Sequence, residues 1–164
     1  MKTSVNTVTT TFDSPLGLVR LAANPQGLCG VWFDGHDDSP DASHWAPDPN
    51  HALLQQATRQ LGDYFAGQRR QFELPLDLST GTPFQQSVWR ALLDIPFGQT
   101  CSYGTVSAAI GKPSAVRAVG GAIGRNPLSI MVPCHRVIGA NGALTGYSGG
   151  MQRKVALLQL ERAL

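Results

Sequence analysis

The sequence has no long apolar run. In 164 residues, no stretch approaches the roughly 20 consecutive apolar residues that a membrane-spanning helix needs. The polar, threonine-rich residues that follow Met1-Lys2-Thr3-Ser4 also differ from the apolar core of a signal peptide. We therefore expect a cytoplasmic protein that has no membrane segment.

Cysteine is scarce as well, with three residues at positions 29, 101 and 134. Their odd number and wide spacing argue against a disulfide framework and fit a reducing compartment. A zinc site in the first half would draw on Cys29, His36, His44 and His51, and the spacing of these four residues matches no compact zinc pattern. We predict that the protein binds no metal and needs no cofactor.

Acidic side chains are almost missing from the second half of the chain. After position 79 only Asp94 and Glu161 are acidic, against eight lysines and arginines, which gives residues 80–164 a net charge of +6. Residues 1–79 hold nine acidic and five basic side chains, a net charge of −4. A polyanion such as nucleic acid would therefore meet the second half, although solvated basic residues are common and give only weak evidence.

The first half shows the apolar segments and turn residues of a small antiparallel sheet. Residues 7–12, 18–22 and 28–33 are expected to be strands, separated by turns that contain Pro, Gly and Asn. Residues 34–50 are acidic and rich in proline, so we expect an exposed loop with too little apolar surface to order itself. Apolar residues at helical spacing predict a helix over residues 51–67, ended by a glycine.

The second half begins with a helix signal and continues as a helix-turn-helix. Thr82-Pro83-Phe84-Gln85 is a capping box with proline at the first helical position, and this helix should end near Ile95. Two further short helices are predicted at residues 105–110 and 114–124, the second with Ser114 as its N-cap.

The second of these short helices has few bulky side chains. Glycine inside a helix costs roughly 1 kcal/mol relative to alanine. A helix with so many small residues therefore needs a structural or functional explanation. Tight packing against another helix and entry into a groove of DNA both provide one, and the pattern alone favours neither. The small residues are Ala115, Ala118, Gly120, Gly121, Ala122 and Gly124.

A potential nucleophile stands beside an imidazole in the run Pro133-Cys134-His135-Arg136-Val137. Nearby cationic or imidazole groups favour a thiolate, which is the reacting form of cysteine. The apolar run 128–132 predicts an extended segment, in which Cys134 and His135 point to opposite faces and communicate through a water molecule. Glu161 is the candidate for a third group that orients the imidazole.

These and other segments resemble the O6-alkylguanine-DNA alkyltransferases, in the same order and over nearly the whole chain. The resemblance implies an α+β fold of two domains. Residues 1–79 would form a pared-down ribonuclease H fold with a three-stranded antiparallel sheet and a helix, and residues 80–164 would be mostly helical. The matching segments are Asp13-Ser14-Pro15-Leu16-Gly17, Pro83-Phe84-Gln85, Val88-Trp89, Ser102-Tyr103-Gly104, Arg117-Ala118-Val119-Gly120, Asn126-Pro127, residues 133–137, Gly146-Tyr147-Ser148-Gly149-Gly150 and Leu160-Glu161.

The resemblance implies direct-reversal DNA repair by a single-turnover methyltransferase. Cys134 would take the alkyl group from the O6 atom of guanine, with O4-alkylthymine as a second candidate substrate, and the thioether that forms has no release step. His135 would act as the base through water, Glu161 would hold its imidazole, and Asn126 would brace the active-site turn. Because the lesion lies inside the duplex, base flipping is required.

The same resemblance assigns six residues to DNA and base binding. Arg117 would fill the gap left by the flipped base, and Tyr103 would help to rotate the base and donate a hydrogen bond to it. Outside this family, a solvated arginine and a core tyrosine would be the better interpretations. Gly104, Lys112 and Ala140 differ from the family pattern, so no DNA contact is assigned to them. The six residues are Tyr103, Arg117, Gly120 and Arg125, together with Tyr147 and Ser148 of a glycine-rich loop that would line the pocket.

We expect the partner to be alkylated double-stranded DNA, bound through its minor groove by a monomer. Two other function classes share parts of the pattern. In a lesion-binding or regulatory DNA protein the cysteine would be incidental. A cysteine hydrolase with the same Cys, His and acid would instead turn over many substrate molecules.

Overall fold

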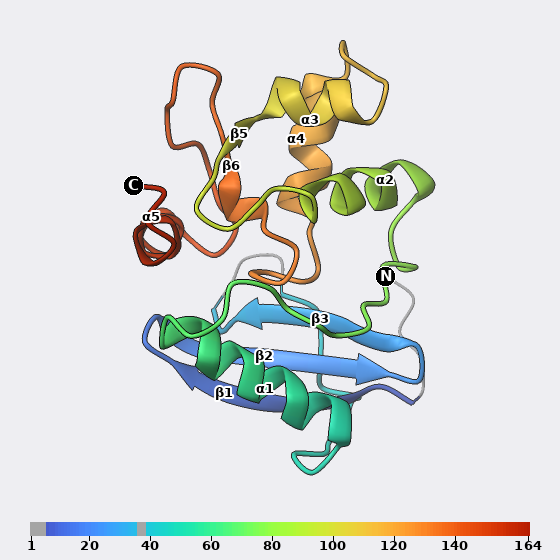
Figure 1. Cartoon of the computed structure of the whole chain (residues 1–164). Coiled ribbons are helices and arrows are strands. Elements are labelled where there is room, and N and C mark those ends of the chain that lie inside the picture. The colour runs from blue at the N-terminus through green and yellow to red at the C-terminus, as the bar shows by residue number, and fades with distance from the viewer. Residues whose placement is uncertain (1–5, 36–38) are drawn as a thin grey trace.

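The computed structural model describes residues 6–35 and 39–164, and it combines a small sheet with a mostly helical second half (Figure 1). The expected α+β fold is confirmed. His36, one of the candidate zinc ligands, lies outside the described residues. Within the described ranges, no group of three His, Cys, Asp or Glu side chains is arranged to hold a metal ion. None of the helices described is long and apolar enough to cross a membrane.

Three strands form the antiparallel meander that the sequence predicts. They are β1 (Val8–Ser14), β2 (Gly17–Asn24) and β3 (Gly27–Phe33). Gly17 closes the β1–β2 turn with a φ of +118°, a conformation that favours glycine. The strand order in the sheet is β3-β2-β1-β4.

The fourth strand corrects the expectation of an unstructured acidic loop over residues 34–50. β4 (Ala46–Pro47) pairs in parallel with β1. The ring of Trp45 meets that of Trp32 edge-on at a centroid distance of 6.1 Å, on a face of the sheet that carries its own small apolar cluster. The acidic composition hid this contact, because one tryptophan supplies enough apolar surface to fix the end of the loop.

Helix α1 (Ala52–Phe65) lies across the sheet, as Figure 1 shows. Its buried residues recur at helical spacing and face the strands. The predicted glycine stop is present, because Gly67 has a φ of +76° and its N–H donates to the carbonyl of Tyr64. The buried residues are Leu54, Ala57, Leu61 and Tyr64.

Strand β3 is buried along its whole length because both halves of the chain cover its free edge. The N–H of Leu28 donates to Pro75 O at 2.9 Å, in the segment that crosses between the halves. Farther along, the N–H of Val31 donates to Pro127 O at 2.9 Å, and Ser129 N–H returns a bond of 2.9 Å to Val31 O. The segment that leads to Cys134 is therefore fastened to the sheet.

The helices of the second half differ from the expected bounds at their ends. α2 (Pro83–Leu92) has the predicted capping box, but it ends three residues before Ile95. α3 (Tyr103–Ala109) begins earlier than predicted, because the Ser102 side chain accepts the N–H of Thr105 and caps it. The N-cap of α4 (Val116–Gly124) is Ala115, which makes no side-chain capping bond. Ser114 is therefore not the N-cap, contrary to the prediction. α5 (Met151–Leu160) follows the glycine-rich loop.

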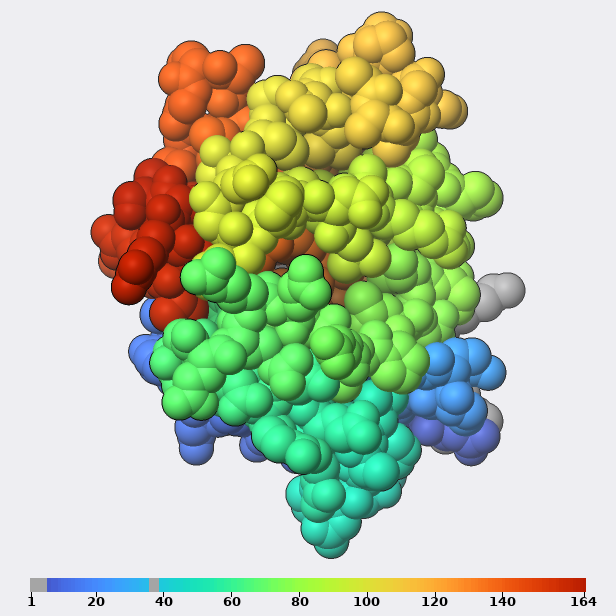
Figure 2. Space-filling model, in the orientation of Figure 1, coloured from blue at the N-terminus to red at the C-terminus, as the bar shows by residue number. Residues whose placement is uncertain are grey.

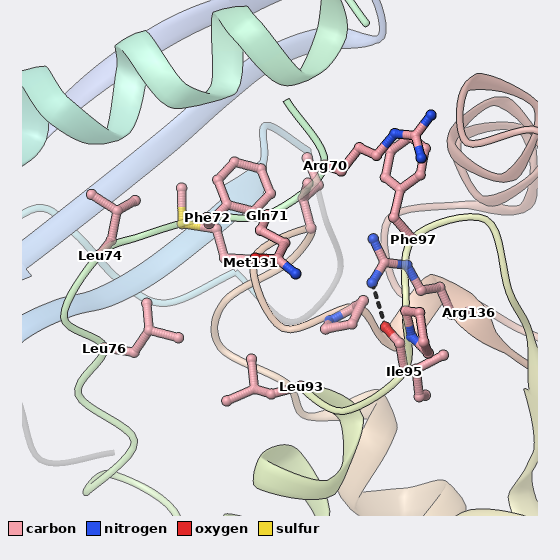
Figure 3. A pocket seen from close by; sticks show the side chains of 13 residues that line it. Arg70, Gln71, Phe72, Leu74, Leu76, Leu93, Ile95, Phe97, Met131 and Arg136 are labelled. Atoms are coloured by element: carbon pink, nitrogen blue, oxygen red, sulfur yellow. Dashed lines mark hydrogen bonds between the residues drawn. The ribbon is translucent and has the colours of Figure 1, made fainter. Parts of the chain in front are cut away.

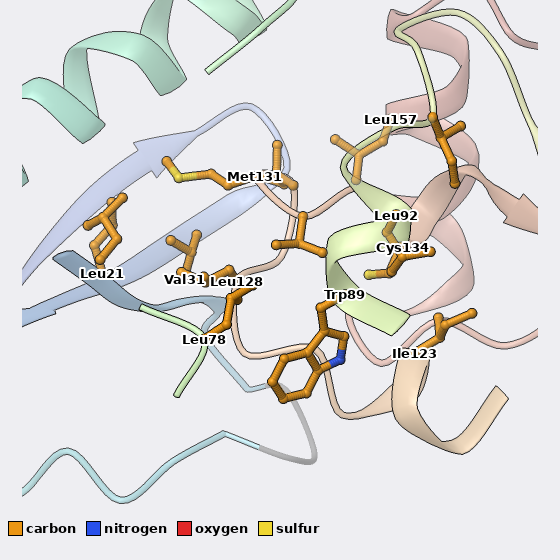
Figure 4. Close-up of a cluster of buried hydrophobic side chains, with 14 of the residues drawn as sticks. Leu21, Val31, Leu78, Trp89, Leu92, Ile123, Leu128, Met131, Cys134 and Leu157 are labelled. Atoms are coloured by element: carbon orange, nitrogen blue, oxygen red, sulfur yellow. The ribbon is translucent and has the colours of Figure 1, made fainter. Parts of the chain in front are cut away.

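One continuous apolar core joins the two halves (Figure 4). Leu21 and Val31 enter it from the sheet, and Leu157 enters it from α5. Trp89 of α2 adds a hydrogen bond of 2.8 Å from its indole Nε1 to Ala122 O of α4. Cys134 lies within the same core, so the nucleophile belongs to the folded interior.

The capping box of α2 provides a stability test. Thr82 Oγ1 accepts the N–H of Gln85 at 3.1 Å, and Gln85 Oε1 accepts the N–H of Thr82 at 3.0 Å. Thr82→Ala should lower the free energy of unfolding by about 1 kcal/mol, because it removes the hydroxyl that satisfies the Gln85 N–H. Urea unfolding measures this change, and the control Thr82→Ser should stay close to wild type. Equal stability of all three proteins would contradict the capping assignment.

Candidate active site around Cys134

Asn126 holds the turn that leads to the cysteine. Its side-chain oxygen accepts the N–H of Leu128 at 2.9 Å, and its Nδ2 donates to Val132 O at 2.8 Å. Asn126 is buried, so these bonds satisfy polar groups that water does not reach. At the tip of the turn, Ile130 has a φ of +73°, which is uncommon for a residue with a branched side chain.

Cys134 is not on an extended segment, which corrects the sequence interpretation. Cys134, His135 and Arg136 form the short 3-10 helix η1 (Cys134–Arg136), and Cys134 N–H donates to Val132 O at 2.8 Å. The apolar run before it is a tight turn, since Val132 N–H donates back to Leu128 O. Among the described contacts, no hydrogen bond joins the side chains of Cys134 and His135.

A small cavity of about 40 Å³ lies beside Cys134. Its walls come from α3, α4 and the glycine-rich loop, which are far apart in the sequence. It is little larger than the share of one water molecule in liquid water, about 30 Å³. Five of the ten predicted site residues line it together. The lining residues are Tyr103, Gly120, Ile123, Gly124, Cys134, Gly146, Tyr147 and Ser148.

The hydroxyl of Tyr103 is engaged at this cavity. It lies 2.6 Å from Thr145 Oγ1, in the loop that precedes Tyr147 and Ser148. Gly120 of α4 faces the ring of Tyr103, since a Cβ at this glycine would lie 3.8 Å from the ring. The tyrosine therefore links α3, α4 and the glycine-rich loop around the thiol.

Behind the cysteine, the structure places His135 against Glu161 in a fully buried cluster. His135 Nε2 lies 2.7 Å from Glu161 Oε2, and both side chains have no exposed surface. Arg136 donates from Nε to Oε1 at 2.8 Å and from Nη2 to Oε2 at 3.0 Å. Arg136 is therefore a buried structural cation rather than a surface contact for DNA.

Arg136 also connects this cluster to a larger cavity between the two halves. Its Nη1 donates to Ile95 O at 2.6 Å, as the dashed line in Figure 3 shows. The cavity measures about 600 Å³. Figure 2 shows a hollow between the green segment after α1 and the yellow-green segment after α2. Phe72 and Phe97 lie on its walls (Figure 3), so the crossing segment, the segment after α2 and η1 meet at this cavity.

The electrostatics of the cluster fix which groups carry charge. Burial raises the pKa of Glu161, but hydrogen bonds from His135 and Arg136 outweigh burial and hold its pKa at about 2. Burial lowers the pKa of His135, and this exceeds the opposite effect of Glu161. A neutral His135 beside an ionised carboxylate keeps its proton on Nε2. The other ring nitrogen, Nδ1, is then the acceptor, and it is buried without a hydrogen-bond partner among the described residues.

The thiol itself is held in its protonated form. Burial raises the pKa of Cys134, while a hydrogen bond from Asn126 and the charge of Lys154 lower it by less. Cationic and imidazole neighbours favour a thiolate, but at Cys134 the effect of burial on the pKa is larger. A proton must therefore leave Cys134 before it reacts.

Three residues of the site escaped the sequence analysis. Lys154 is buried, and its Nζ donates to Val137 O at 2.6 Å and Thr145 O at 3.1 Å, which ties α5 to the loop beside Cys134. The only sequence signal was a lysine within an apolar helix pattern. Arg153 donates to Leu16 O at 3.0 Å and lies over the ring of Phe33 at 4.5 Å.

The third is Tyr64, at an apolar position of α1, which donates a hydrogen bond to Glu161. Nothing in the sequence showed that its hydroxyl reaches the other half of the chain.

The remaining predicted DNA-binding residues lie outside the cavity, on the surface of α4. Arg117 is exposed in the first turn of the helix, and Arg125 is exposed at its C-cap. Gly121 and Gly124 are exposed between them, and a Cβ at either position would meet no heavy atom within 4 Å. At these two glycines, the thin surface faces open space rather than another helix.

The buried carboxylate predicts a pH-dependent contribution to stability. Glu161→Gln should lower the free energy of unfolding by about 3 kcal/mol near neutral pH, because Arg136 would lose its buried counter-charge. The folded pKa of Glu161, about 2, lies below its ordinary value of 4.5. The stabilisation is therefore fully present above about pH 5.5 and is lost as the pH falls through 4.5 toward 2. Urea unfolding from pH 7 to pH 3 should show the gap between wild type and variant shrinking; a constant gap would contradict the assignment.

Comparisons with known proteins agree with this arrangement. The family model described as 6-O-methylguanine DNA methyltransferase, ribonuclease-like domain, matches residues 7–78, and the DNA binding domain model of the same name matches residues 83–163. A methylated-DNA–protein-cysteine methyltransferase from Mycobacterium tuberculosis is 51% identical over 153 residues, covering 93% of this chain and 91% of the relative. A constitutive relative of that name from Bacillus subtilis is 46% identical over 160 residues, covering 93% and 94%.

Solved structures show the same fold over nearly the whole chain. The crystal structure of the Mycobacterium tuberculosis O6-methylguanine methyltransferase has a TM-score of 0.87 at 50% identity, covering 96% of this chain and 93% of that one. The structure of Mycobacterium tuberculosis OGT in complex with DNA has a TM-score of 0.88 at 49% identity, covering 95% and 93%. The Pyrococcus kodakaraensis O6-methylguanine-DNA methyltransferase has a TM-score of 0.65 at 27% identity, covering 94% and 98%. The chain belongs to the 6-O-methylguanine DNA methyltransferase family.

Proposed function

We propose that this protein repairs alkylated DNA by moving the alkyl group from O6 of guanine onto Cys134, once per protein molecule. The observation that carries the proposal is the placement of one thiol between two environments. On one side is the cavity lined by Tyr103, Tyr147 and Ser148. On the other is the buried pair of His135 and Glu161. A substrate base can enter from the first side, while the second side accepts the proton of the thiol.

The charge state of the cluster suggests how the thiol is activated. Neutral His135, with its proton on Nε2 toward Glu161, has a free lone pair on Nδ1 that can take the Cys134 proton through a water molecule. The resulting imidazolium is stabilised by the Glu161 carboxylate. The thiolate then attacks the alkyl carbon, so that an S–C bond forms while the C–O bond to guanine breaks.

The electron pair of the broken C–O bond moves onto guanine. A hydrogen bond from the Tyr103 hydroxyl would stabilise this charge as it develops, and a proton from solvent or a neighbouring donor completes the neutral base. The product on the protein is a thioether, which offers no electrophilic carbonyl to water. The reaction therefore ends with the protein alkylated.

The size of the cavity indicates that the site opens for the base. A volume of about 40 Å³ holds little more than a water molecule, and a purine needs several times more. Movement of the glycine-rich loop would enlarge the cavity, and it would break the contact between Tyr103 and Thr145. The hydroxyl of Tyr103 would then become available to the flipped base.

We further propose that α4 enters the minor groove and that Arg117 occupies the gap left by the flipped base. The exposed glycines Gly121 and Gly124 let the helix backbone approach DNA closely, and Arg125 adds positive charge at the end of the same surface. The net charge of +6 on residues 80–164 favours a polyanion on this half. The DNA complex of the Mycobacterium tuberculosis relative supports DNA binding by this fold.

Several finer proposals accompany the main one. The chain would divide into functional units at residues 1–79 and 80–164, act as a monomer in the cytoplasm, and accept O4-alkylthymine in DNA as a second substrate. The proposal assigns no metal or cofactor to the reaction, because a thiol, a base and a hydrogen-bond donor complete the atom balance of the transfer.

The single-use mechanism predicts that intact mass changes once. Incubation with excess O6-methylguanine duplex should add one methyl group to the protein, and repair should stop at one equivalent. Cys134→Ser should abolish transfer, while Cys101→Ser should react like wild type because Cys101 does not line the cavity. Continued turnover would favour a cysteine hydrolase, and transfer that survives Cys134→Ser would favour a DNA-binding protein with an incidental cysteine. Mass spectrometry and product counting separate these outcomes.

The thin surface of α4 predicts an effect of side-chain size on DNA binding. Gly121→Leu should weaken binding to alkylated duplex by roughly tenfold, because a bulky side chain keeps the helix away from the groove floor. Gly121→Ala should weaken it less and should stabilise the fold by up to about 1 kcal/mol, since alanine favours the helix. Fluorescence anisotropy measures the affinity, and the reaction rate with free O6-alkylguanine base serves as a control that should not change. Wild-type DNA affinity in Gly121→Leu would contradict minor-groove entry by this face.

A further inference from the structure

Helix α1 of the N-terminal half contributes a hydrogen-bond donor to the buried cluster behind the cysteine. The hydroxyl of Tyr64 lies 2.5 Å from Glu161 Oε2, although the two residues are 97 positions apart in the sequence. Tyr64 is 1% exposed and Glu161 is 1% exposed, so water does not compete for this bond. The contact therefore ties the first half of the chain to the carboxylate that meets His135.

The direction of this hydrogen bond follows from chemistry. An ionised carboxylate only accepts hydrogen bonds, so the Tyr64 hydroxyl must be the donor. Burial and the negative charge of Glu161 both raise the pKa of Tyr64, which keeps its hydroxyl protonated near neutral pH. A short bond from a hydroxyl to an ionised oxygen is among the stronger kinds in proteins.

The two oxygens of Glu161 are not equivalent. Oε1 accepts one bond, from Arg136 Nε. Oε2 accepts three, from His135 Nε2, Arg136 Nη2 and the Tyr64 hydroxyl. Tyr64 thus shares the very oxygen that holds the imidazole. Within the described part of the chain, it is also the only donor to Glu161 that comes from the N-terminal half.

Aromatic packing holds the Tyr64 hydroxyl in place. Its ring contacts Phe65, Phe72 and Phe97 at centroid distances of 5.3, 5.4 and 6.2 Å. Phe97 belongs to the C-terminal half, and Figure 3 shows it on the wall of the larger cavity near Arg136. The donor is therefore packed against aromatic rings from both halves of the chain.

We propose that Tyr64 is a positioning residue for alkyl transfer, which fixes Glu161 Oε2 and withdraws negative charge from the oxygen that holds His135. This inference rests on the proposed relay through His135 and Glu161. Without the hydroxyl, Oε2 becomes more basic and stabilises the imidazolium form of His135 more strongly. His135 would then remain protonated up to a higher pH, and it could not accept the Cys134 proton there.

The charged and titratable groups around the relay are the same in wild type and in a Tyr64→Phe variant. Arg136 faces Glu161 from η1, Lys154 acts on His135 from α5, and Cys134 and Tyr147 lie on the cavity side. Phenylalanine keeps the ring and its packing. A change in the pH profile of Tyr64→Phe therefore reports on the lost hydroxyl.

The experiment measures the single-turnover rate of methyl transfer from an O6-methylguanine duplex between pH 5 and pH 9. In Tyr64→Phe the acid limb of the profile should move to higher pH by about half a unit or more, which slows transfer about threefold or more on that limb. The matched control is Thr82→Ala, which weakens the cap of α2 and leaves the Tyr64 hydroxyl and its aromatic packing intact. This control should lower the melting temperature and leave the acid limb in place.

Two outcomes overturn the inference in different ways. If Tyr64→Phe has the wild-type acid limb, or only a lower melting temperature like Thr82→Ala, the hydroxyl does not tune the relay, and the proposed function stands. If His135→Gln transfers methyl groups as fast as wild type, the relay itself is wrong, and the role of Tyr64 is lost with it. Slow transfer in His135→Gln together with a shifted limb in Tyr64→Phe supports both.

Discussion

The buried carboxylate of Glu161 is the group on which the rest of the site depends. A charge without exposed surface destabilises a fold strongly unless donors surround it, and here the donors come from different parts of the chain. His135 and Arg136 approach from η1, and Tyr64 approaches from α1. Arg136 in turn bonds the carbonyl of Ile95 beyond the end of α2. Three of the four hydrogen bonds to the carboxylate come from η1 and the fourth comes from α1, so it has its full set of donors only when both halves are docked.

The edge of the sheet imposes the second constraint. Val31 of β3 exchanges backbone hydrogen bonds with residues 127 and 129, and Asn126 closes the turn that follows. These bonds set where the chain re-enters the core and therefore where Cys134 lies. The N-terminal half is far from Cys134 in the sequence, yet it fixes the position of the nucleophile through this edge and its environment through Tyr64.

Local features of the fold were readable from the sequence, whereas features that depend on distant contacts were not. The capping box at Thr82 and the glycine stop of α1 involve neighbouring residues, and both were predicted correctly. The conformation at Cys134 depends on the attachment of the preceding turn to β3, so an apolar run gave the wrong answer. Trp45 and Tyr64 likewise owe their roles to partners that no spacing rule identifies. The residues around the cavity came from the family resemblance, because composition alone does not bring α3, α4 and the glycine-rich loop together.

The protonated, buried thiol suits a protein that can react only once. A standing thiolate at the surface would be exposed to oxidants and unrelated electrophiles, and each such reaction would remove a molecule permanently. Burial raises the pKa of Cys134, and in the proposed mechanism activation is left to His135, which takes the proton at the moment of attack. The small cavity adds a second condition to the proposed mechanism, in which the glycine-rich loop releases Tyr103 from Thr145 before a base enters. Reactivity is thus tied to the presence of a base in the cavity, so the thiol is consumed by the lesion rather than by its surroundings.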